Sequence, residues 1–146
     1  MIMKKPTLLL AAAMLALFSG CSPGEHKDGH HNEEGEHAGA PALVQLDNGK
    51  KWLANIETTQ GMQSMAQMVD TALSNPDATA VSIKENLLSG FSDILDKCTM
   101  TGEPHEQLHH YLVPLKEDIE RLDEGNKEEV LADIKAYLDT YKNYFE

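Results

Sequence analysis

The sequence predicts an all-α fold, an antiparallel four-helix bundle with up-down topology. Apolar residues recur at steps of three and four from residue 56 onward, as they do on the buried face of a helix. Gly, Pro and Asn interrupt this pattern at three places, and no stretch alternates strands with helices. Four amphipathic helices joined by short loops pack readily in up-and-down order. With 146 residues, the chain has room for one such domain and a leading segment.

Residues 1–20 have the features of an export signal peptide. Lys4 and Lys5 precede an apolar run, PTLLLAAAMLALFSG, that is shorter than the ~20 residues of a membrane-spanning helix. Cys21 follows directly, and LFSG-Cys resembles the lipobox of bacterial lipoproteins, with Phe18 where such boxes usually carry Leu. The resemblance implies cleavage before Cys21 and lipid attachment to it. It therefore implies a protein anchored in the cell envelope, on the periplasmic face or the outer surface.

The chain is strongly acidic, with a formal net charge of -12. Removal of residues 1–20 takes away Lys4 and Lys5 and no acidic residue, which moves the charge from -12 to -14. A surface of this sign repels nucleic acids and favours cations. We therefore expect no nucleic-acid partner. The membrane, reached through the lipid on Cys21, is the expected partner, and a protein partner for metal transfer is unknown.

Residues 21–42 are expected to form a disordered tether rich in His, Glu and Gly. They include no aliphatic residue larger than Ala and no aromatic residue, so they bury too little apolar surface to offset the entropy of ordering. Histidine-rich tracts gather zinc, copper or nickel loosely, and a merely solvated spacer is the alternative. The histidines of the tether are His26, His30, His31 and His37.

Residues 43–146 are expected to be the folded helical domain. Asp47-Asn48-Gly49, placed between apolar residues, predicts a short β-hairpin before the first helix. The first helix is predicted over residues 56–74, and Asn75-Pro76-Asp77 ends it. Its buried face is expected to consist of Met62, Met65, Ala66, Val69, Ala72 and Leu73.

The second helix is predicted over residues 79–98, with Cys98 at its end and facing inward. Gly102 turns the chain, and Pro104 suits the first turn of a third helix that runs to Gly125. The expected buried residues are Leu87, Phe91, Ile94 and Leu95 on the second helix, and Leu108, Leu112, Leu115, Ile119 and Leu122 on the third.

A fourth helix is predicted from Asn126 to the end of the chain. Asn126 and Glu129 have nearly the spacing of a capping box, in which two side chains satisfy the first free backbone amides of a helix. Its buried residues are expected to be Val130, Ile134, Tyr137, Leu138, Tyr141 and Phe145.

The junction of the second and third helices carries a candidate metal site. His105 and His109 are about one helical turn apart and share a flank of the apolar stripe, whereas His110 falls on the solvent side. If Cys21 carries lipid, Cys98 is the only thiol left to the mature protein. Met100 lies in the loop between them. Thiolate and imidazole bind zinc or copper, and a thioether favours Cu(I).

Other sulfur and nitrogen side chains are weaker candidates. Met62 and Met65 of the first helix are auxiliary candidates, although methionines at this spacing usually pack in a core. The histidines of the tether are further auxiliary candidates. The thiol and the two helical imidazoles also have a purely structural interpretation. Cys98 would then be a buried core residue, and the two histidines would lie hydrogen-bonded at the edge of the core. No CxxC or HExxH zinc motif occurs.

The pattern CTMxGxxHxxLH in a small acidic lipoprotein is similar to that of uncharacterised exported helical-bundle lipoproteins of bacteria. The similarity covers about residues 46–122 and implies no established activity. It supports treating four residues as one unit: Cys98, Met100, His105 and His109.

Three functions compete on this evidence. The first is a lipid-anchored metal-binding protein for sequestration or delivery, with copper first and zinc next. The second is a b-type haem-binding bundle, because Met and His can ligate haem between helices. The third is an interaction or structural lipoprotein without a cofactor. We expect no enzyme, because a bundle of this size offers little room for a substrate cleft.

Overall fold

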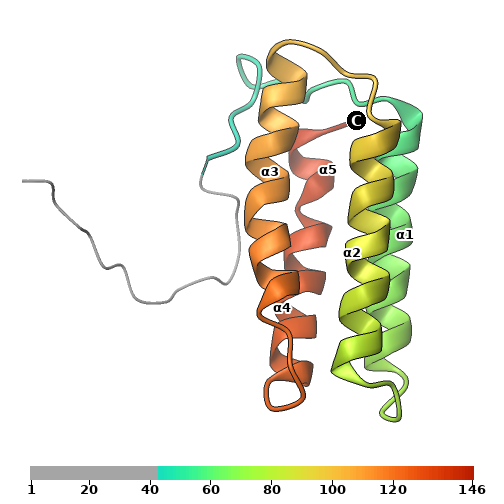
Figure 1. Ribbon diagram of the computed structural model, residues 1–146. Helices are drawn as coiled ribbons and strands as arrows, with labels where there is room; N and C mark the ends of the chain where they lie inside the picture. The colour runs from blue at the N-terminus through green and yellow to red at the C-terminus, as the bar shows by residue number, and fades with distance from the viewer. Residues whose placement is uncertain (1–42) are drawn as a thin grey trace, which may run out of the picture. The chain divides into compact units, whose positions relative to one another are not determined.

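A computed structural model describes residues 43–146 (Figure 1). The predicted signal peptide, Cys21 and the predicted tether lie outside the described residues. The all-α prediction is confirmed for the part that is described, which holds helices and no named strand. The helices are α1 (Ile56–Leu73), α2 (Ala80–Lys97), α3 (Glu103–Glu120), α4 (Lys127–Asp139) and the short α5 (Tyr141–Tyr144).

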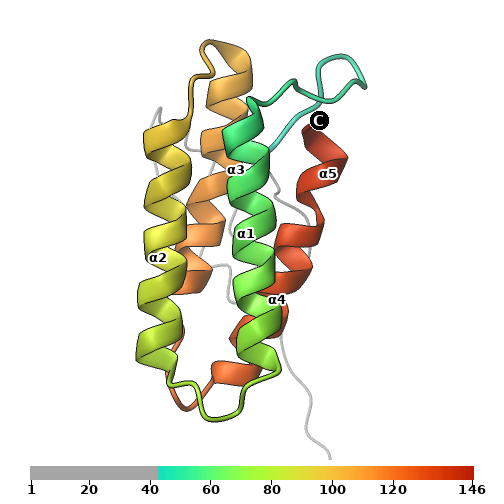
Figure 2. The same cartoon turned by 90° about the vertical axis from the view of Figure 1, so that its right-hand side faces the viewer.

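The four longer helices lie side by side as a helical bundle (Figures 1 and 2). Helix α1 contacts α2 and α4, and α3 contacts the same two helices, so the four enclose one apolar core. The largest fully buried side chains include Met65 of α1, Leu87 of α2, Tyr111 of α3 and Ile134 of α4. Between residues 43 and 146, none of the helices is both long and apolar enough to cross a bilayer.

The segment before α1 crosses one end of the bundle. Asp47 and Lys50 exchange backbone hydrogen bonds of 2.9 Å in both directions. Asn48 (φ 49°) and Gly49 (φ 85°) adopt the left-handed backbone of a tight two-residue turn. This is a single bridged pair, so the predicted short hairpin stays a prediction. The backbone N–H of Trp52 then donates to the carbonyl of Tyr144 at 2.8 Å, which ties this segment to the C-terminal end of the chain.

Two apolar side chains that were expected in the core are exposed. Leu73 and Leu95 are each 41% exposed, which corrects the predicted buried faces of α1 and α2. Each stands eight residues after a fully buried residue, Met65 or Leu87. Eight residues correspond to about 80° of rotation around a helix, so these two leucines lie at the border of the apolar stripe.

Helix α3 ends at Glu120, earlier than the predicted end at Gly125. In the following loop, side chains form hydrogen bonds with the backbone N–H and C=O groups that helix continuation would have paired. The carboxylate of Asp123 accepts from the N–H of Gly125 at 2.7 Å, and the amide of Asn126 donates to the carbonyl of Arg121 at 2.8 Å. Such local bonds compete with helix continuation. They also use the Asn126 side chain, so Asn126 stands at the N-cap of α4 without a capping hydrogen bond, contrary to the predicted capping box.

Candidate metal centre

The candidate centre begins where α2 ends. Cys98 is the C-cap of α2 and has an extended backbone (ψ 120°), so the chain leaves the helix directly at the thiol. Gly102 adopts φ 67° and ψ -149°, a conformation that strongly favours glycine. The Gly102 carbonyl accepts from the N–H of His105 at 3.0 Å and starts α3 there. This tight turn returns the first turn of α3 to the thiol.

The thiol and the two predicted imidazoles form a continuous cluster, the thiol–imidazole cluster of Cys98, His105 and His109. The Sγ of Cys98 lies 3.6 Å from the Nδ1 of His105, and the side chains are partly buried there. The Nε2 of His105 lies 3.0 Å from the Nε2 of His109, on the exposed side. The structure therefore brings together the three residues that the spacing of the sequence predicts to lie close.

The central ring of the cluster uses its two nitrogens in different directions. Nδ1 of His105 faces the sulfur and Nε2 faces His109. One ion can bind Cys98 and His105 through Nδ1, or His105 and His109 through Nε2. Binding by all three side chains at once requires His105 to turn. In residues 43–146, no group of three or more His, Cys, Asp and Glu side chains is arranged to hold a metal ion.

The sulfur-to-nitrogen spacing matches that of two donors on one ion. Metal–sulfur and metal–nitrogen bonds of about 2.3 and 2.0 Å at a tetrahedral angle place the two donor atoms about 3.5 Å apart. The spacing of 3.6 Å between Cys98 and His105 is that of a thiol–imidazole hydrogen bond, and it is also close to the separation of two donors on one tetrahedral ion. Met100 lies two residues from Cys98 and packs, half-buried, against the core.

Asn55 holds the loop that carries the thiol. Its side-chain amide donates to the carbonyl of Lys97 at 3.1 Å, and its side-chain oxygen accepts from the N–H of Thr99 at 3.4 Å. These two hydrogen bonds fix the backbone immediately before and immediately after Cys98. Sequence reasoning missed this role because the partners of Asn55 are more than forty residues away along the chain.

Tyr141 of α5 is buried and interacts electrostatically with Cys98 of the cluster. Burial raises the pKa of Tyr141, the bond with Thr59 opposes this, and the charge interaction with Cys98 raises the pKa further. The hydroxyl of Tyr141 lies 3.3 Å from that of Thr59. Tyr141 was predicted to be a core residue of the last helix, and its place near the thiol had no signal in the sequence.

The remaining candidate ligands have other surroundings. Met62 and Met65 are 3% and 0% exposed in the apolar core. Met65 packs beside Gly90, which is eight residues, or about 12 Å of helix, before Cys98. His110 is exposed, as predicted. The four histidines of the tether and Cys21 lie outside the described residues.

Comparison with protein-family models, with curated proteins and with solved structures finds no match for this chain. Function is therefore inferred from the side-chain chemistry of residues 43–146 and from the composition of the whole chain.

Proposed function

We propose that this chain is a lipid-anchored metal-binding protein outside the cytoplasm, for copper first and zinc next, acting in sequestration or delivery. The observation that carries the proposal is the 3.6 Å spacing between the Sγ of Cys98 and the Nδ1 of His105. The two atoms come from different helices and are held by a glycine turn and by the Asn55 clamp on the loop. An ion entering between them meets donors that are already in position.

The donor set favours Cu(I) over zinc. Soft sulfur ligands select Cu(I), and the half-buried Met100 offers a thioether two residues from the thiol. Structural zinc sites instead use four donors drawn from thiolate, imidazole and carboxylate. Cu(I) needs only two or three donors; Cys98 and His105 would supply two, and Met100 is the candidate third. His109 offers a second imidazole at the exposed edge, where an arriving or departing ion passes.

We propose roles in metal binding for other parts of the chain as well. Cys21 would carry the lipid that holds the protein in the membrane, and the helices would stack as an antiparallel up-down bundle above it. The histidines of the tether would collect ions loosely, because imidazoles on a flexible chain pay the entropy of ordering. The net charge of -12 would concentrate cations near both sites.

The test is a titration of the purified protein with Cu(I) against a competing chelator. We expect the double variant Cys98→Ser, His105→Ala to lose more affinity than the roughly 10- to 100-fold that loss of an outer-shell partner costs. The matched control is His110→Ala, which removes a neighbouring exposed imidazole outside the cluster; it should keep the parent affinity.

Unchanged Cu(I) affinity in the double variant would remove the proposal. Two alternatives have their own readouts in the same preparation. A Soret absorption band after addition of haem would support the haem-binding bundle, with Met100 or Met62 and His105 or His109 as candidate ligands. If the protein folds without any ligand and its stability does not change when metals or haem are added, the result would support the cofactor-free interaction protein.

A further inference from the structure

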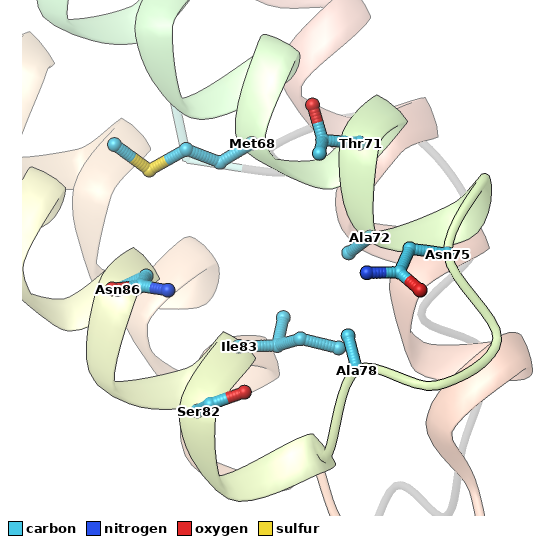
Figure 3. Close-up of a pocket in the computed structure, with 8 residues that line it drawn as sticks. All are labelled: Met68, Thr71, Ala72, Asn75, Ala78, Ser82, Ile83 and Asn86. Carbon is cyan, nitrogen blue, oxygen red and sulfur yellow. The ribbon is translucent and has the colours of Figure 1, made fainter.

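A hollow of about 260 Å³ opens between the C-terminal part of α1 and the N-terminal part of α2 (Figure 3). Met68, Ala72 and Ile83 provide its apolar wall, and Asn75, Ser82 and Asn86 provide polar groups around it. This volume admits several water molecules, and therefore a small organic group.

The polar groups of the hollow are uncharged and point inward. The side-chain nitrogens of Asn75 and Asn86 face the hollow from opposite sides (Figure 3). The Asn75 oxygen accepts from the N–H of Asp77 at 3.2 Å, which fixes the amide with its nitrogen turned inward. The Ser82 hydroxyl donates to the carbonyl of Thr79 at 3.0 Å, so its oxygen keeps lone pairs for a ligand.

No charged residue lines the hollow, although 25% of the chain is charged. Among the lining residues a charged ligand meets no opposite charge, and the Lys127 ammonium beside the hollow is already bonded to the carbonyls of Pro76 and Ala78. Anions are further opposed by the net charge of -12. No aromatic ring lines the hollow, so a sugar would find no stacking platform. The remaining class is a neutral molecule with carbonyl oxygens, amide hydrogens and a small apolar group.

We propose that this hollow binds a short neutral segment of peptide chain. Two inward amide groups suit peptide carbonyls, the Ser82 oxygen suits a peptide N–H, and the wall of Ala72, Ile83 and Met68 suits a small apolar side chain. An asparagine amide matches a peptide group with one donor and one acceptor. Methionine in the wall adapts its shape to different side chains.

The hollow lies at the N-terminal end of α2, and the thiol–imidazole cluster lies at the C-terminal end of the same helix. Helix α2 begins at Ala80, beside the hollow, and its last residue is followed by Cys98. Eighteen helical residues correspond to about 27 Å. The peptide site therefore does not rest on the proposed metal function, and either can fail without the other.

The experiment is a nitrogen-15 NMR titration of the purified protein with N-acetyl-alanine N′-methylamide, a neutral diamide. Sodium acetate serves as the charged comparison and glucose as the neutral comparison without an amide. We expect saturable shifts of the side-chain amide signals of Asn75 and Asn86 with the diamide alone. The variant Asn86→Ala should weaken binding about fivefold, as expected for one hydrogen bond. The matched control Asn143→Ala removes an exposed asparagine on α5 and should bind like the parent.

Absence of saturable shifts with the diamide would overturn the proposal. So would equal binding of acetate or glucose, or an Asn86→Ala variant that keeps the parent affinity. Circular dichroism of each variant verifies that the helices are retained, so that lost binding reports on the hollow and not on unfolding.

Discussion

At the scale of single residues, two buried tyrosines form reciprocal hydrogen bonds across the core. The hydroxyl of Tyr111 donates to the carbonyl of Tyr137 at 2.7 Å, and the hydroxyl of Tyr137 donates to the carbonyl of Tyr111 at 2.9 Å. Unpaired hydroxyl or carbonyl groups would be costly at this depth. The reciprocal pair removes that cost and ties α3 to α4. It also commits both phenols to their protonated form, because a phenolate cannot donate.

This commitment predicts a loss of stability at high pH. Burial raises the pKa of Tyr111, Tyr137 and Tyr141 above the ordinary value of 10.0. The folded chain thus keeps protons that the unfolded chain releases near pH 10. The contribution to the free energy of unfolding is complete below pH 10 and falls as the pH rises above it. Urea unfolding at about pH 9 and about pH 11 should show this decrease.

The variant Tyr137→Phe isolates the tyrosine contribution. The pKa of Lys135 is also raised, through its bond with Asp70, and its deprotonation lowers stability in the same direction. Tyr137→Phe removes one of the shifted phenols and leaves Lys135 in place, so its stability should fall less steeply with pH. The idea fails if parent and variant have parallel pH profiles.

At the scale of elements, α1 and α2 approach closely at a glycine. A Cβ atom added to Gly61 of α1 would lie 2.4 Å from the Cγ1 of Ile94 on α2, too short for any real contact. A Cβ added to Gly90 of α2 would lie 3.3 Å from the flexible Met65 side chain. The two glycines face the same helix pair but differ in the room around them.

Gly61→Ala is therefore expected to destabilise the protein. Overpacking against Ile94 costs about 1–3 kcal/mol, and the better helix propensity of Ala returns only about 1 kcal/mol. Gly90→Ala is the matched control, because Met65 can shift and the propensity gain remains. The free energy of unfolding measured in urea should be at least as high for Gly90→Ala as for the parent, and lower for Gly61→Ala. The reverse order would contradict the close approach of α1 and α2.

Helix positions could be predicted from the sequence where periodicity and turn residues agree. Helices α1 and α2 lie within one residue of their predicted ends. The end of α3 was missed because Asp123 and Asn126 bond to local backbone groups, a competition that periodicity does not reveal. Similarly, Thr140 donates to the carbonyl of Tyr137 at 2.6 Å where α4 ends, so the fourth helix divides into α4 and α5.

The candidate site was also predictable only in part, because some of its contacts join residues that are far apart in the sequence. The spacing of four residues placed His105 and His109 on one flank, and the end of α2 placed Cys98 near them. The division of the His105 nitrogens between the two partners depends on the angle at which α3 leaves Gly102. The contributions of Asn55 and Tyr141 come from other parts of the chain. One-dimensional spacing carries no information on such contacts.

At the scale of the whole molecule, excess negative charge opposes folding. The described residues form five ion pairs; Asp118 is buried, but the other charged groups are partly or largely exposed, so most of these pairs contribute little. Residues 43–146 contain 19 Asp and Glu and 9 Lys and Arg, a net charge of 9 minus 19, or -10, and folding brings these carboxylates closer together than in the unfolded chain. We therefore expect charge repulsion to outweigh these ion pairs.

Salt should therefore stabilise the protein. The screening length is about 30 Å at 0.01 M salt and about 10 Å at 0.1 M, so added sodium chloride weakens repulsion between distant carboxylates before it weakens close pairs. We expect the melting temperature to rise by a few degrees over about this range of concentration. The variant Glu85→Gln, Asp96→Asn removes two exposed charges of α2 and should have a higher melting temperature at low salt and a smaller response to salt. A melting temperature that falls as salt is added would mean that the ion pairs, and not the excess of carboxylates, dominate the electrostatics of the fold.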